Sequence, residues 1–160
     1  MRTAPDGPSG ADFVTTFIPF ASDDAVAAIG RGLIDRTLPK IAWSHGGHFA
    51  AALWLIRERP DLDPPRDMPP LIRAYNEATG VANTDHGGYH ETITQASLRA
   101  ARAFLATRPA GESLYESCNA LMASPLGKPD WLLSYWSKGR LFSVEARRAW
   151  LEPDLAPLPS

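Results

Sequence analysis

Apolar residues recur at intervals of three and four along most of the chain, the spacing of one face of an α-helix. In the first such segment, about residues 24–38, Val26, Ile29 and Leu33 share a face, and Pro39 ends the pattern. The same pattern predicts helices at about residues 41–58, 68–79, 89–107 and 113–123, and shorter ones at about 130–138 and 143–150. No alternating pattern typical of a β-strand competes with them.

Proline and glycine residues separate the predicted helices. Pro60 and Pro109 follow the second and fourth helices, and Gly80 is suited to end the third. We therefore expect an all-α fold, a four-helix bundle with a helical, proline-rich C-terminal extension.

The ends of the chain differ from its middle. Residues 1–12 contain proline, glycine and scattered apolar side chains, and we expect them to form a flexible arm. Residues 13–160 are expected to form a single helical domain, with the apolar segment 13–20 packed on its body.

Composition narrows the class of protein. The chain has 160 residues and a net charge of −2, and a nucleic-acid-binding protein typically carries a basic excess. Its single cysteine, Cys118, excludes an intramolecular disulfide. The longest apolar run, residues 49–56, is shorter than the roughly 18 residues of a membrane span, and the N-terminus lacks the apolar core of a signal peptide. We expect a cytoplasmic protein that binds neither nucleic acid nor membrane.

The second predicted helix carries a His-x-x-His motif. His45 and His48 are three residues apart, so they share a helix face, and that face continues into an apolar stripe that points to the core. Gly46 and Gly47 beside them cost about 1 kcal/mol each relative to alanine. The glycines indicate close approach of another segment or a ligand, although a frayed helix start also explains them. The motif alone fits a metal ligand pair or two hydrogen-bonded core histidines.

The fourth predicted helix opens with Gly-Tyr-His-Glu-Thr-Ile-Thr, residues 88–94. His90 shares a face with Ile93 and points inward, and the positive end of the helix dipole disfavours its protonated form. The same dipole favours Glu91 as an anion. These two residues fit either a reactive pair or a capping carboxylate beside a core histidine.

Topology places the two motifs near each other. In an up-down-up-down bundle the second and fourth helices run in the same direction, diagonally across the core, so their N-termini lie at one end. His45, His48 and His90 are then within about one turn of a common level and form three nitrogen ligands for a metal. Tyr75 and the loop that contains His86 lie at the same end of the bundle.

The combined motifs resemble those of a group of small uncharacterised bacterial helical proteins. The resemblance covers the chain from about residue 42 onward and includes Tyr135-Trp-Ser137, Leu141-Phe-Ser143, Ala146-Arg147 and Pro153-Asp154-Leu155. It implies that His45, His48, His90 and Glu91 are motif positions of that group, and it implies no activity. A looser similarity, in bundle shape and inward histidines, is to DinB-like metal-binding proteins, although the motif spacing departs from theirs. The Glu-x-x-His pair of di-iron proteins is absent, so we do not expect a dinuclear centre.

These observations predict a mononuclear metal-dependent enzyme that acts on a small organic molecule as a hydrolase, lyase or oxidoreductase. A single zinc or iron ion would be held by His45, His48 and His90, with one position open for water or substrate. Glu91 would be a fourth ligand or a general base. The further catalytic candidates are Tyr89 and His86, and the substrate-binding candidates are Tyr75, Trp131, Tyr135 and Arg147.

Two alternatives remain open at this stage. One is a metal-free enzyme that uses His90 and Glu91 for acid–base chemistry in a cyclase, isomerase or lyase reaction. The other is a non-catalytic ligand-binding helical protein whose buried histidines only form hydrogen bonds. A homodimer is also considered. The segment 131–157 is expected to dock on the bundle, because its short helices are not stable alone. It either closes the site or only covers the side of the bundle.

Overall fold

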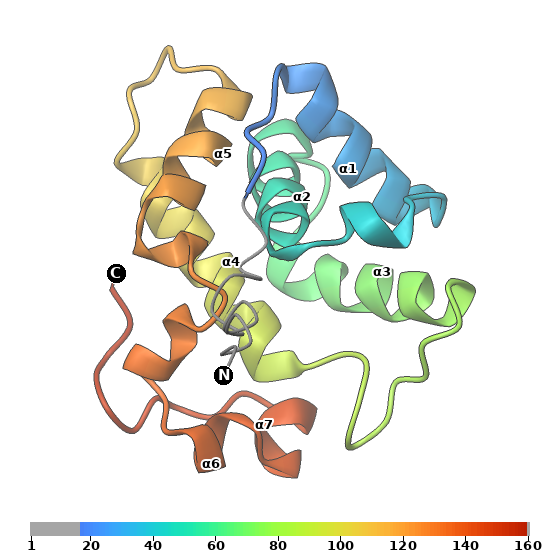
Figure 1. Cartoon of the computed structure of the whole chain (residues 1–160), viewed down its shortest axis with the longest axis vertical. Helices are drawn as coiled ribbons and strands as arrows, with labels where there is room; N and C mark the ends of the chain where they lie inside the picture. Colours follow the sequence, from blue (N-terminus) through green and yellow to red (C-terminus); the bar gives the residue numbers. More distant parts are fainter. Residues whose placement is uncertain (1–16, 160) are drawn as a thin grey trace, which may run out of the picture.

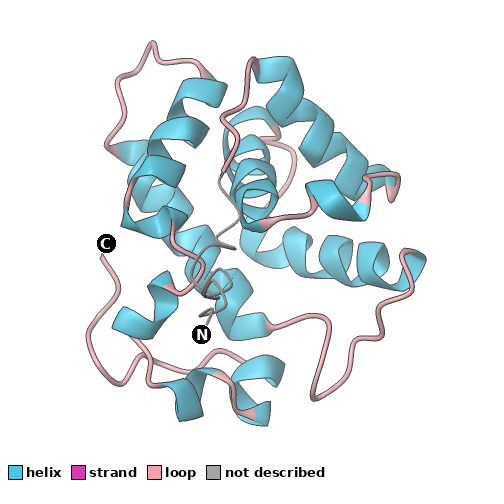
Figure 2. Cartoon of the chain, viewed as in Figure 1, coloured by secondary structure: helices cyan, strands magenta, loops and turns pink. Residues whose placement is uncertain are grey.

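The computed structural model describes residues 17–159, and these residues form helices and no β-strand (Figure 2). The all-α prediction is confirmed. The α-helices are α1 (Asp23–Asp35), α2 (His45–Glu58), α3 (Pro64–Ala78), α4 (Glu91–Ala106), α5 (Leu114–Ala123), α6 (Lys138–Leu141) and α7 (Val144–Arg148). Short 3-10 helices are η2 (Lys40–Ala42), η3 (Pro125–Gly127) and η4 (Trp131–Ser134). The predicted flexible arm, residues 1–12, and the start of the apolar segment 13–20 lie outside the described residues.

Helix α2 lies at the centre of the fold, with α1 and α3 on one side and α5 on the other (Figure 1). Its residues from Phe49 to Leu55 are all buried, because they are apolar around the whole circumference of the helix. Helices α2 and α4 are in direct contact, so the predicted diagonal placement of these two helices is wrong. A helix that is apolar on every side is packed against neighbours on every side, and α4 is one of them.

Helix starts depend on local capping. Helix α2 begins at His45 rather than at residue 41, because the Ser44 side chain accepts a hydrogen bond from the Gly47 amide at 3.1 Å and so caps the helix. Gly47 packs directly against the preceding turn, since a Cβ atom there would lie 2.2 Å from the Ala42 carbonyl oxygen. Close approach by the chain itself therefore explains this glycine.

Helix α3 begins earlier than residue 68. Pro64 and Pro65 occupy its first turn, where an amide proton has no partner within the helix. Pro69 and Pro70 consequently lie inside the helix, whereas the predicted start at residue 68 would place them in its first turn. The buried side chains of Pro64 and Met68 attach this start to the core.

The C-terminal extension follows α5 and contains η3, η4, α6 and α7. It packs on the start of α4 through α6 and α7 (Figure 1). The Trp136 side chain is fully buried, and its indole Nε1 donates a hydrogen bond to the Leu151 carbonyl at 3.0 Å. The Thr92 hydroxyl donates to the Ala149 carbonyl at 2.9 Å and accepts from the Leu151 amide at 3.1 Å. The predicted helix at residues 130–138 is instead a 3-10 turn followed by α6.

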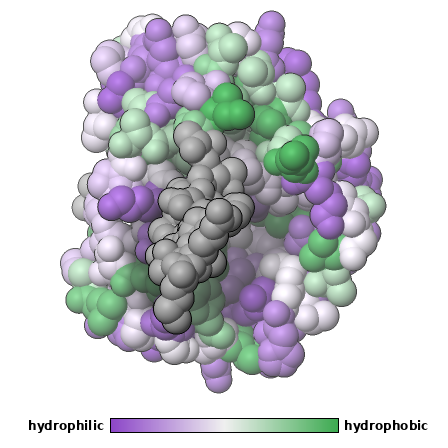
Figure 3. Space-filling view, viewed as in Figure 1, coloured by the Kyte–Doolittle hydropathy of each residue, from purple (hydrophilic) through white to green (hydrophobic). Residues whose placement is uncertain are grey.

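The surface is mixed in polarity. On the face shown in Figure 3, hydrophobic residues form separate patches among polar ones. The large hydrophobic side chains most exposed among residues 17–159 are Ile18, Ile41, Phe142 and Leu155. No helix in the described part of the chain combines the length and the apolar character that crossing a membrane requires.

Candidate functional site

His90 is held by hydrogen bonds at both ring nitrogens. It caps α4, because its Nδ1 accepts a hydrogen bond from the Ile93 amide at 3.1 Å. Nδ1 is therefore unprotonated, and the proton on Nε2 is donated to the Leu141 carbonyl at 2.8 Å. Burial lowers the pKa of His90, and the nearby Arg147 charge lowers it further against the opposing effect of the Leu141 bond. The neutral ring joins α4 to α6, and neither nitrogen offers a free electron pair to a metal.

His45 joins the start of α2 to η3. Its Nε2 donates a hydrogen bond to the Leu126 carbonyl at 2.8 Å, and its ring packs edge-on against Phe49 at a centroid distance of 5.2 Å. Phe49 in turn contacts Trp131 of η4, with ring centroids 6.2 Å apart. His45 thus supports the C-terminal extension by one hydrogen bond and through one shared aromatic neighbour.

His48 lies one turn further along α2. Its ring stacks on the Trp43 indole at a centroid distance of 3.7 Å, and its Nδ1 donates a hydrogen bond to the Ser44 carbonyl at 2.7 Å. Burial lowers the pKa of His48 to about 4, against the opposing effect of the Ser44 bond and with a further decrease from His45. His48 is therefore neutral at pH 7, and its Nε2 has no hydrogen-bond partner among the described residues.

Tyr89 and Glu91 form a local hydrogen-bonded pair. The Tyr89 hydroxyl donates to Glu91 Oε2 and the Gln95 side-chain Nε2 donates to Glu91 Oε1, both at 2.8 Å. The Arg73 guanidinium lies 4.6 Å from the centre of the Tyr89 ring. Burial raises the pKa of Tyr89 well above its usual value, and its bond to the Glu91 carboxylate raises it further. Tyr89 is consequently a hydrogen-bond donor and not a base at neutral pH.

The remaining predicted site residues lie in different surroundings. Tyr75 is buried and its hydroxyl donates to the Leu38 carbonyl at 2.8 Å, while His86 is exposed on the loop before α4. Arg147 donates to the Gly88 and Tyr89 carbonyls, both at 3.1 Å, and so holds this loop. Asp154 of the C-terminal tail accepts hydrogen bonds from the Ser137 amide at 2.7 Å and the Ser137 hydroxyl at 2.6 Å.

A cavity of about 400 Å³ lies at the surface of η3 and η4. The structure brings two predicted substrate-binding residues together there: Trp131 and Tyr135 line the cavity, with ring centroids 5.9 Å apart. The other lining residues are Pro125, Leu126, Lys128, Asp130, Leu133 and Ser134. Tyr75 and Arg147, the other predicted substrate-binding residues, do not line this cavity.

The cavity depends on a close turn after α5. A Cβ atom on Gly127 would lie 1.8 Å from the Met122 carbonyl oxygen, so only glycine fits at this position of η3. Lys128 and Asp130 give the cavity its charged groups, and sequence reasoning did not identify them. Their signal was present, since Lys128 lies between Pro125 and Pro129 and Asp130 directly precedes Trp131.

The predicted zinc or iron site does not fit the side chains as they are arranged. His90 uses both nitrogens in hydrogen bonds, and within residues 17–159 no group of three or more His, Cys, Asp and Glu side chains is placed to hold a metal ion. His45 Nε2 donates a hydrogen bond to the Leu126 carbonyl of η3, and His48 Nδ1 donates one to the Ser44 carbonyl. Metal binding stays a prediction, which metal analysis of the purified protein tests.

Comparison of the chain with protein-family models, with curated proteins and with solved structures found no match.

Proposed function

We propose that the protein binds a small organic molecule in the cavity of η3 and η4, that His45 supports this cavity, and that His48 and His90 form structural contacts rather than carry out chemistry. The observation that carries the proposal is the position of Trp131 and Tyr135 side by side in a cavity of about 400 Å³. Ligand pockets typically have this size, with aromatic and apolar walls and a few polar groups.

The lining residues indicate the chemistry of the ligand. Trp131 and Tyr135 offer aromatic faces and edges, while Pro125, Leu126 and Leu133 offer apolar contact. Lys128 at the same cavity supplies a positive charge. Asp130 supplies a negative charge at the same cavity. A small aromatic molecule with one anionic group matches this combination when that group pairs with Lys128 and the uncharged part of the molecule faces Asp130.

His45 is a positioning residue in this proposal. It does not line the cavity, but its Nε2 holds the carbonyl of Leu126, which does. Phe49 supports Trp131 from the same helix. The first two turns of α2 therefore fix two parts of the cavity wall, which explains a histidine at the start of this helix without a metal.

The competing enzyme hypothesis with His90 and Glu91 is less well supported. An acid–base catalyst needs a nitrogen or oxygen within hydrogen-bond reach of a substrate. Both nitrogens of His90 and both oxygens of Glu91 already have protein partners. Binding without conversion is the better match to these contacts.

Benzoate is a suitable probe of the cavity, and its binding is measured by ¹H–¹⁵N NMR titration at low salt. We expect saturable shifts of the Trp131 indole signal and of amides in residues 125–135. Tyr135→Ala should weaken binding about fivefold, because it removes one aromatic wall. The matched control is Phe142→Ala, an exposed aromatic residue of the same extension, which should bind benzoate as the natural chain does.

Two results would contradict the proposal. One is the absence of saturable shifts in residues 125–135. The other is equal benzoate affinity in the Tyr135→Ala variant and the natural chain.

A further inference from the structure

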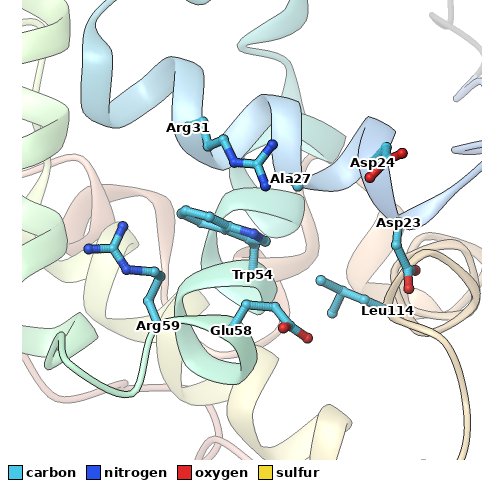
Figure 4. Close-up of a pocket in the computed structure, with 8 residues that line it drawn as sticks. All are labelled: Asp23, Asp24, Ala27, Arg31, Trp54, Glu58, Arg59 and Leu114. Atoms are coloured by element: carbon cyan, nitrogen blue, oxygen red, sulfur yellow. The ribbon is translucent and has the colours of Figure 1, made fainter.

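A second cavity, of about 460 Å³, lies between α1, the end of α2 and the start of α5, away from the residues of the proposed site. Its lining consists of Asp23, Asp24, Ala27, Arg31, Trp54, Glu58, Arg59 and Leu114 (Figure 4). We infer that this cavity binds a small zwitterion of the amino-acid or dipeptide type. The inference is independent of the η3 and η4 cavity.

Charges of opposite sign occupy different sides of the cavity. Figure 4 shows Arg31 and Arg59 around one part of the Trp54 indole, whereas Asp23 and Asp24 lie together at the other side, near Leu114. The spacing along α1 produces this arrangement, because Asp24 and Arg31 are seven residues apart and so lie on one helix face about two turns from each other. A ligand that carries both charges, separated by a short backbone, matches the two sides at once.

Part of this charge is already used within the protein. Arg59 donates two hydrogen bonds to Asp61, at 2.9 and 2.8 Å, and Asp23 accepts one from the Tyr115 amide at 2.8 Å. Arg31 and Asp24 form neither an ion pair nor a side-chain hydrogen bond with any of residues 17–159. One guanidinium and one carboxylate therefore remain available to a ligand.

Trp54 forms a fixed floor. Its indole lies directly on Gly30, where a Cβ atom would be 2.1 Å from a ring carbon, and only 5% of the residue is exposed. The α1–α2 contact thus prevents the ring from turning to fill the cavity. A fixed floor between two opposite charges favours a ligand of defined length.

The balance of charges excludes simpler ligands. A polyanion such as a nucleotide would meet Asp23, Asp24 and Glu58 as well as Arg31. A simple amine would leave the guanidinium of Arg31 without a partner. A zwitterion places its carboxylate on Arg31, in the geometry that guanidinium groups prefer, and its ammonium toward Asp24, because Glu58 is already paired with Arg57 at 3.7 Å.

Glycylglycine is the probe that tests this inference, with N-acetylglycylglycine and glycylglycinamide as controls that lack one charge each. The measurement is a ¹H–¹⁵N NMR titration of the full chain at low salt and pH 7. We expect saturable shifts of the Trp54 indole signal and of α1 amides with glycylglycine. Each control peptide should bind about three- to fivefold more weakly, the range of a single exposed ion pair.

Two variants assign the charges. Arg31→Gln should weaken glycylglycine binding by the same factor and remove the difference between glycylglycine and glycylglycinamide. Asp24→Asn should remove the difference between glycylglycine and N-acetylglycylglycine. Arg102→Gln, at an exposed position of α4, is the control and should leave all three affinities unchanged.

The inference is overturned if glycylglycine produces no saturable shift, or if all three peptides bind equally. It is also overturned if the shifts lie in residues 125–135 instead of α1 and Trp54. Failure of benzoate to bind would leave this result unaffected, because the two cavities share no lining residue.

Discussion

Replacing His90 with alanine should lower the free energy of unfolding by about 3 kcal/mol. The substitution removes the cap of α4, which accepts from the Ile93 amide, and leaves the Leu141 carbonyl without its hydrogen-bond donor. Loss of a helix cap costs about 1 kcal/mol, and a buried unsatisfied polar group costs a further 1–3 kcal/mol. Urea unfolding followed by circular dichroism measures the difference.

Two further variants separate these contributions. The asparagine of His90→Asn caps helices well, but its shorter side chain does not reach the Leu141 carbonyl. This variant should therefore recover about 1 kcal/mol of the loss. His86→Ala, at an exposed position four residues away, should leave stability within about 0.5 kcal/mol of the natural chain. Unfolding of His90→Ala at the same urea concentration as the natural chain would refute the anchoring role.

Acid should destabilise the protein between pH 6.5 and about pH 4, because the pKa of His48 falls from 6.5 to about 4 on folding. In this range the unfolded chain binds a proton that the folded chain does not, so lowering the pH favours unfolding. His48 alone should account for a loss of about 3 kcal/mol by pH 4, and the lowered pKa of His90 acts in the same direction.

The experiment compares the slope of unfolding free energy against pH in three chains. His48→Gln should reduce the slope between pH 6.5 and pH 4, whereas the exposed-site variant His86→Gln should keep it. Asp67 and Glu112, whose pKa values are lowered to about 2 on folding from 3.8 and 4.5, begin to lose their contribution near the lower end of this range. All three chains share that loss, so the difference in slope between them reports His48. An unchanged slope in His48→Gln, or stability that rises on acidification, would contradict the account.

The helices were predictable because their signals are local. The periodic apolar face of α1 and the prolines that follow α2 and α4 are visible in the sequence, and helices α1 to α5 lie within four residues of their predicted bounds. The Ser44 cap and the 3-10 turn at η4 were not predicted. The packing of the helices against one another was harder to predict from the sequence. The apolar run 49–56 shows that α2 is buried on every side, and this feature argues against a diagonal α2–α4 pair.

The candidate site shows a different limit of sequence reasoning. Trp131 and Tyr135 were predicted to bind a ligand because they are aromatic residues near a turn. The structure places both of them at one cavity. The partners of His45 and His90 were not predictable, since both are backbone carbonyls, of Leu126 and Leu141. Every residue has a carbonyl, so such an acceptor leaves no signature in the sequence.

The central claim is that His45 and His90 anchor the C-terminal extension through the Leu126 and Leu141 carbonyls, and that none of the motif histidines holds a metal. Long-range ¹H–¹⁵N spectra of the histidine rings test it most directly, recorded at pH 7 before and after addition of equimolar zinc and, in a separate sample, ferrous iron. We predict a neutral His90 ring with its proton on Nε2, and histidine signals that do not change with either metal. Joint metal-dependent shifts or broadening of His45, His48 and His90 would contradict the claim and restore the metal centre.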